Sequence, residues 1–173
     1  IHKGQLVAQT YGPGFDASTP LLGWSMTKSV TAALVGMQIA DGKLAMDQDG
    51  FWPQGSAGRE AIRLSNLMAM DDGLAFNEGY GDVSDVTRML YLEPDMAAYM
   101  QARPLAHQPG SFWNYSSGTT VFLSHLWQQA AGSQSLELPY SRLFAPLGMH
   151  SAIIEADARG TLVGSSYMYA TAQ

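Results

Sequence analysis

Cysteine is absent from the 173-residue sequence, which excludes a disulfide framework and any metal site built on thiolates. Basic residues are few: nine Lys and Arg stand against 15 Asp and Glu, for a net charge of −6, and the six arginines are scattered. A nucleic-acid partner is therefore not expected. The best apolar run, residues 30–40, falls far short of the roughly 20 residues that span a bilayer, and it contains Thr31 and Gln38. We expect no membrane span, and the lack of cysteine leaves the cellular compartment open.

The sequence does contain enough apolar material for one domain, because 46% of its residues are hydrophobic. It starts at IHKGQLVAQ, without an initiator Met or a charged and then apolar leader, so we expect any signal peptide to lie outside it. Apolar periodicity and helix breakers predict a mostly helical chain with strands only near its two ends. The expected helices are 25–40, 64–70, 85–92, 95–102, 119–131 and 139–148, and the expected extended segments are 4–12 and 151–173.

The helix predicted from Ser25 to Ala40 has apolar residues on most faces and a left-handed stop at Gly42, so we expect it to be buried on nearly all sides. Ser25 and Lys28 lie one turn apart on one face, where the amine can approach the hydroxyl. A helix N-terminus also favours negative charge on that hydroxyl. The spacing fits a serine nucleophile with a lysine that handles its proton. It fits equally well a Ser25 that only caps the helix and a Lys28 that extends to solvent.

A second candidate element is Tyr-x-Ser, formed by Tyr115 and Ser117 just before the helix expected from Thr119. A phenol beside an ammonium group can be driven toward phenolate, which takes a serine proton and later returns it to a leaving group. The alternative is a core tyrosine that donates one hydrogen bond. Serine, lysine and tyrosine together provide what acyl transfer through a serine ester requires.

Three segments occur in an order and at separations that resemble a known family: GWSMTKSVTAALVG (23–36), IRLSNLMAMDDGL (62–74) and QPGSFWNYSSG (108–118). They resemble the class C-like branch of the serine beta-lactamase and penicillin-recognising superfamily, with its esterases and 6-aminohexanoate-dimer hydrolase. The resemblance covers essentially the whole chain. It implies an α/β, beta-lactamase/transpeptidase-like fold in which an antiparallel sheet with flanking helices meets a helical region, with the site between them.

The resemblance also implies roles for single residues. Ser25 would be the acylated nucleophile, Lys28 its proton-handling partner, Tyr115 the general base and acid, and Ser117 a residue that lines the substrate site. Residues 1–173 would form a partial beta-lactamase-like domain, with 1–24 as strand and loop leading in and 25–173 as nucleophile helix and helical region. The implied partner is a small-molecule ester, amide or beta-lactam, with no metal and no organic cofactor.

Two departures from the family pattern affect this interpretation. Many lactamases of this class have Tyr-x-Asn where this chain has Tyr-x-Ser, which favours esters or linear amides over beta-lactams. The family's third element, Lys/His-x-Gly on a strand that lines the site, does not follow Tyr115. That strand supplies one of two oxyanion donors, and loss of one donor costs about 10² to 10³ in rate. We therefore expect the chain alone to be a weak catalyst that can associate with itself.

Two other functions remain open from the sequence. One is a non-catalytic ligand-binding or sensor domain of the same fold, which would be acylated slowly at most. The other is a helical interaction module with accidental motifs. No Gly-x-Ser-x-Gly elbow or zinc-binding spacing is present, and His107 and His125 are interpreted as structural. In the loop FNEGYGD, Gly79 and Gly81 flank Tyr80, which fits a mobile lid that presents Tyr80 to substrate and fits equally well a solvent-exposed loop with no role.

Overall fold

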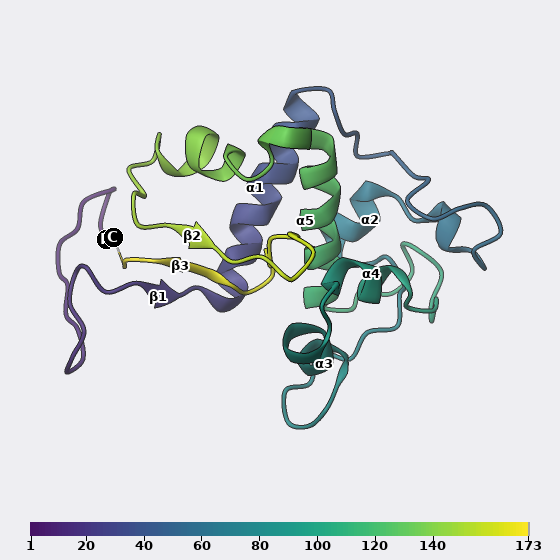
Figure 1. Cartoon of the computed structure of the whole chain (residues 1–173), viewed down its shortest axis with the longest axis horizontal. Coiled ribbons are helices and arrows are strands. Elements are labelled where there is room, and N and C mark those ends of the chain that lie inside the picture. Colours follow the sequence, from purple (N-terminus) through teal and green to yellow (C-terminus); the bar gives the residue numbers. More distant parts are fainter. Residues whose placement is uncertain (173) are drawn as a thin grey trace.

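A small antiparallel sheet brings the two ends of the chain together in this computed structural model, which describes residues 1–172 (Figure 1). Its strands are β1 (Leu21–Leu22), β2 (Ile153–Ile154) and β3 (Met168–Ala170), in the order β1-β3-β2. Leu21 pairs with Ala170 and Ile153 pairs with Tyr169. The sheet therefore places the segment before Ser25 directly beside the C-terminal tail.

The strand expected at residues 4–12 is wrong. These residues are exposed, apart from a partly buried Tyr11, and are irregular beyond an isolated bridge between His2 and Gln5. An alternating pattern forms a strand only where a partner offers backbone groups, and no strand within residues 1–172 pairs with this segment.

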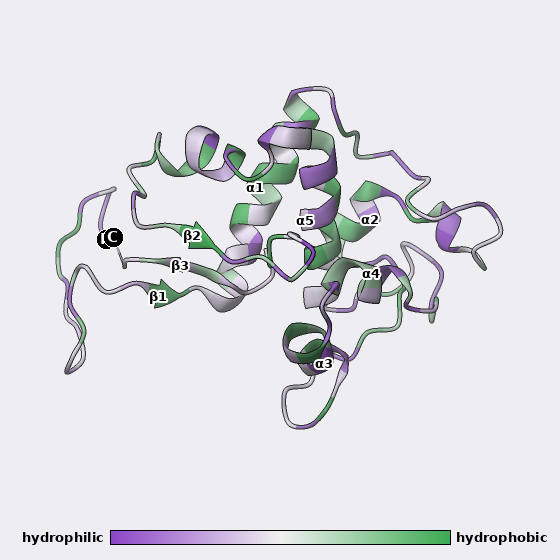
Figure 2. Cartoon of the chain, viewed as in Figure 1, coloured by the Kyte–Doolittle hydropathy of each residue, from purple (hydrophilic) through white to green (hydrophobic). Residues whose placement is uncertain are grey.

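Two long helices form the centre of the fold. Helix α1 (Thr27–Ala40) follows the short 3-10 turn η1 (Trp24–Met26), which contains Ser25, and α5 (Ser117–Ala131) packs against it. The main core includes Leu34 from α1 and Phe122 and Trp127 from α5, all of them almost completely buried. Figure 2 shows apolar residues in β1 and β2 and in stretches of α1 and α5.

Helix α1 ends as expected, with Gly42 at a φ of 70°. The expectation that it is buried on nearly all sides is wrong. Ser29, Ala32, Gly36 and Ala40, spaced three or four residues apart, form one exposed face. The reason is that no described segment packs against these small residues, so their side of α1 remains open.

The helical region wraps around α5. It contains α2 (Leu64–Ala69), α3 (Asp85–Leu92) and α4 (Met96–Gln101), close to the predicted positions, and a short 3-10 turn, η2 (Arg59–Ala61), that was not predicted. Helix α2 ends early, because Met70 adopts a left-handed φ of 57°. After α5 come η3 (Gly132–Gln134) and η4 (Pro139–Phe144), a π-helical segment in place of the longer helix expected at 139–148. No helix within residues 1–172 is long and apolar enough to cross a membrane.

Candidate active site

A tight turn places Ser25 between the sheet and α1. The Gly23 N–H donates to the Met168 carbonyl at 2.7 Å, which ties the turn to β3. A Cβ atom at Gly23 would lie 3.2 Å from that carbonyl oxygen, so little space is left for a side chain. Trp24 has a φ of 44°, a strained left-handed conformation for a bulky residue. The turn leaves Ser25 exposed one residue after Trp24.

Lys28 connects this turn to two other parts of the chain. Its Nζ lies 3.3 Å from the Ser25 Oγ, 3.1 Å from the Ser117 Oγ and 3.1 Å from the Ser165 carbonyl oxygen. An ammonium group has three N–H donors, and here each of them has an acceptor. The Lys28 side chain therefore turns inward instead of extending to solvent. No side-chain cap is present at η1 or α1, so the capping role for Ser25 is not observed either.

Tyr115 lies against the same ammonium group. The Lys28 Nζ is 4.9 Å from the centre of the Tyr115 ring, a distance typical of a cation–π contact. The tyrosine side chain is half-buried. The structure thus brings together the three residues that sequence analysis selected as catalytic, with Lys28 between Ser25 and Tyr115.

Ser117 is fully buried at the first turn of α5 and has a partner that sequence analysis missed. Its N–H donates to Glu78 Oε2 at 2.8 Å, and its hydroxyl donates to Glu78 Oε1 at 2.5 Å. The preceding residue, Ser116, caps α5 by accepting the Thr119 N–H at 3.0 Å. Glu78 is one acid in a Gly-rich loop 39 residues away. No local spacing in the sequence connects it to Ser117.

The Ser165 carbonyl was also missed. It follows Gly164, whose carbonyl accepts the Thr31 hydroxyl at 2.8 Å. A Cβ atom at Gly164 would lie 2.2 Å from both the Thr31 Oγ1 and the Ser124 Oγ, so only glycine permits this close approach. This contact fixes the C-terminal segment against α1 and places the Ser165 carbonyl beside Lys28.

Aromatic rings contact Trp24, the residue before Ser25. The ring of Trp24 makes edge contacts with Tyr80 at 6.3 Å and with Tyr167 at 6.4 Å. Burial and then the nearby Glu78 charge raise the pKa of Tyr80, and burial with a hydrogen bond to Tyr91 raises the pKa of Tyr167. Both phenols are thus neutral near pH 7. Tyr80 thus contacts Trp24, the residue before Ser25, and half of its surface is exposed.

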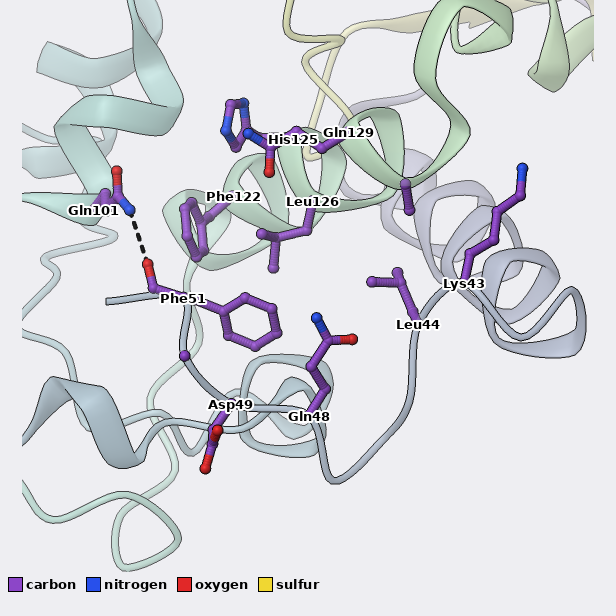
Figure 3. A pocket seen from close by; sticks show the side chains of 12 residues that line it. Lys43, Leu44, Gln48, Asp49, Phe51, Gln101, Phe122, His125, Leu126 and Gln129 are labelled. Carbon is purple, nitrogen blue, oxygen red and sulfur yellow. Dashed lines mark hydrogen bonds between the residues drawn. The ribbon is translucent and has the colours of Figure 1, made fainter. Parts of the chain in front are cut away.

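A separate hollow of about 490 Å³ lies between residues 43–51 and α5 (Figure 3). Phe51, Phe122 and His125 line it, whereas Ser25, Lys28 and Tyr115 do not. His125 stacks on Phe122, and His107 stacks on Phe112. The hollow is therefore separate from the candidate active site.

The described residues 1–172 contain no cluster of His, Asp or Glu arranged to hold a metal ion. The letters His-x-Gly occur once in the sequence, at 2–4. They precede Ser25 and lie in an exposed turn closed by the His2–Gln5 bridge, not on a paired strand after Tyr115. That turn does not match the family's third element in position.

The family profile described as Beta-lactamase matches residues 1–173. No curated protein matches the sequence. A protein described as 6-aminohexanoate-dimer hydrolase from Bacillus anthracis aligns with a TM-score of 0.80 at 20% identity, over 99% of this chain and 50% of its own. Beta-lactamase/D-alanine carboxypeptidase from Yersinia pestis aligns with a TM-score of 0.70 at 19% identity, over 92% of this chain and 53% of its own. D-amino acid amidase from Ochrobactrum anthropi SV3 aligns with a TM-score of 0.69 at 17% identity, over 91% of this chain and 53% of its own.

These similarities establish the expected beta-lactamase/transpeptidase-like fold. The chain spans about half the length of each of these solved structures.

Proposed function

Because the chain belongs to the beta-lactamase family, we propose that it carries the nucleophile of a serine hydrolase that cleaves an ester or amide through an acyl-Ser25 intermediate. The observation that supports this most strongly is the position of Lys28, with its Nζ in contact with the hydroxyls of Ser25 and Ser117 and over the Tyr115 ring. A capping serine and a solvated lysine would need none of these contacts.

The geometry supports a division of work between Lys28 and Tyr115. All three Lys28 N–H groups face acceptors, an arrangement that suits a lysine which stabilises negative charge. Tyr115 would then be the base that takes the Ser25 proton as Oγ adds to the substrate carbonyl. When the C–N or C–O bond breaks, the same proton passes to the leaving amine or alcohol. Water then attacks the acyl ester and releases Ser25.

Linear esters or amides are the proposed substrates, in preference to beta-lactams. Ser117 stands where many lactamases of this class have asparagine, and its hydroxyl is already engaged by Lys28 and Glu78. It is thus poorly placed to bind a beta-lactam's acylamino group. A short-chain nitrophenyl ester should be hydrolysed with a higher specificity constant than a chromogenic cephalosporin, and the reverse order would refute this preference.

Tyr80 is the proposed substrate-facing wall of the site. Its exposed ring contacts Trp24 next to Ser25, which supports a role in holding the substrate. Tyr80→Ala should weaken ester hydrolysis more than Tyr80→Phe, because the ring supplies most of the contact area. If both variants have unchanged kinetics, Tyr80 has no such role.

The experiment that tests the proposal treats the chain with nitrophenyl acetate and follows the mass of the peptide that contains Ser25. The hydrolase hypothesis expects an acetyl increment together with continued nitrophenol release, both lost in Ser25→Ala. A label without continued release would favour the sensor alternative, and no label at all would favour the interaction module.

A further inference from the structure

Glu78 makes an unusually complete contact with Ser117. One carboxylate oxygen accepts the Ser117 N–H and the other accepts its hydroxyl. Glu78 is half-buried and belongs to none of the helices or strands of the fold. The carboxylate thus reaches from a loop to the first turn of α5, beside Lys28.

The hydrogen bonds that join the Ser117 hydroxyl to Lys28 and Glu78 have one consistent direction. A hydroxyl has a single proton, and an ionised carboxylate can only accept. Ser117 must therefore donate to Glu78 and use its oxygen lone pairs to accept from Lys28. By accepting the hydroxyl proton, Glu78 orients the lone pairs of the Ser117 oxygen toward the Lys28 ammonium.

The loop does not need this contact to keep its shape. The Asn77 N–H donates to Asp85 at 2.9 Å, and its side chain accepts the Gly79 N–H at 2.9 Å. The Asn77 carbonyl accepts the Val86 N–H at 3.1 Å. Since α3 already anchors the loop through these bonds, the Glu78 carboxylate is available for another purpose.

We propose that Glu78 is a positioning residue that orients the Ser117 hydroxyl and thereby holds the Lys28 ammonium between Ser117 and Ser25. The role rests on the Ser25 chemistry proposed above, and Glu78 itself touches neither substrate nor nucleophile. Glu78→Gln keeps the size of the side chain and one acceptor oxygen. Its amide N–H groups would donate to the Ser117 oxygen and compete with Lys28 for it.

The first test measures the rate of Ser25 acylation in a double-mutant cycle. Glu78→Gln and Ser117→Ala should each slow acylation about tenfold or more, and Glu78→Gln should add less than about twofold on the Ser117→Ala background, because the hydroxyl it orients is gone. Asp82→Asn is the matched control, since Asp82 is an exposed acid in the same loop whose carboxylate, among residues 1–172, accepts only the adjacent Val83 N–H. An equal loss from Glu78→Gln on both backgrounds would overturn the proposal.

The second test needs no activity and separates this proposal from that of the hydrolase. The chain has three lysines, and Lys3 and Lys43 are exposed. NMR of ¹⁵N-labelled lysine side chains should show slow exchange of the Lys28 ammonium protons alone. That protection should fall in Glu78→Gln and persist in Asp82→Asn, even if Ser25 is never acylated. Unchanged protection of Lys28 in Glu78→Gln would overturn the positioning role.

Discussion

Helices α1 and α5 both begin at the candidate site, yet they are packed very differently. Eleven residues of α5 are buried, including eight consecutive positions from Ser117 to Ser124, whereas only five residues of α1 are buried. The helical region covers α5, and the face of α1 around Gly36 stays open. The Lys28 contacts therefore join a tightly packed half of the site to a loosely covered half.

The largest effect on stability should come from adding a methyl group to the tightly packed half of the site, around α5. A Cβ atom at Gly118 would lie 2.6 Å from both the Met100 sulfur and a Phe76 ring carbon. Gly118→Ala should therefore lower the free energy of unfolding by about 1–3 kcal/mol, since a close-packed core must move to admit a methyl group. Urea denaturation measures this, and a loss below about 0.5 kcal/mol would mean that α4 and α5 pack less tightly than described.

The next largest effect should be a dependence of stability on pH, caused by a buried acid that contacts α5. Asp72 accepts from Leu74 N–H at 2.8 Å and Thr119 Oγ1 at 2.7 Å, and burial raises its pKa. The folded state therefore binds this proton more tightly than the unfolded state. The stability that this bound proton contributes is fully present below about pH 3.9, the ordinary pKa of Asp. It is lost as pH rises through the raised pKa of the folded state.

Asp72→Asn should remove that loss while keeping both hydrogen bonds, because its amide can donate to the Thr119 hydroxyl. The difference in unfolding free energy between variant and parent should then grow in favour of Asn from pH 4 to pH 7. Parallel pH curves for the two proteins would show that the Asp72 proton is not linked to folding.

The smallest effect on stability should come from the open face of α1, and it should stabilise the fold, whereas the change at Gly118 destabilises it. A Cβ atom at Gly36 meets nothing within 4 Å. Gly36→Ala should raise the stability of the 173-residue chain by about 0.5–1 kcal/mol through helix propensity alone. A destabilising effect that depends on protein concentration would instead show that a second copy covers this face, in line with the expected self-association.

The sequence was most informative where contacts are local. The approach of Lys28 to Ser25 follows from helical spacing. Tyr115 and Ser117 could be placed beside Lys28 only through the family resemblance, because 89 residues separate Lys28 from Ser117. Glu78 and the Ser165 carbonyl were missed, since each reaches the site through long-range packing that no local pattern encodes.

The errors have a common physical cause as well. Residues 4–12 alternate like a strand, but no strand within residues 1–172 pairs with them, and α1 has an apolar sequence but no described segment covers one of its faces. Sequence patterns report what a segment can bury, whereas the rest of the chain decides what is buried.

The central claim is that Lys28 joins Ser25 to α5 in one catalytic site, and the rate of Ser25 acylation by nitrophenyl acetate tests it most directly. Lys28→Met should slow acylation by about 10² or more, comparable to the loss of an oxyanion donor. Lys43→Met, a change of the exposed lysine beyond the other end of α1, should leave the rate unchanged. Acylation of Ser25 at the parent rate in a folded Lys28→Met chain would contradict the account.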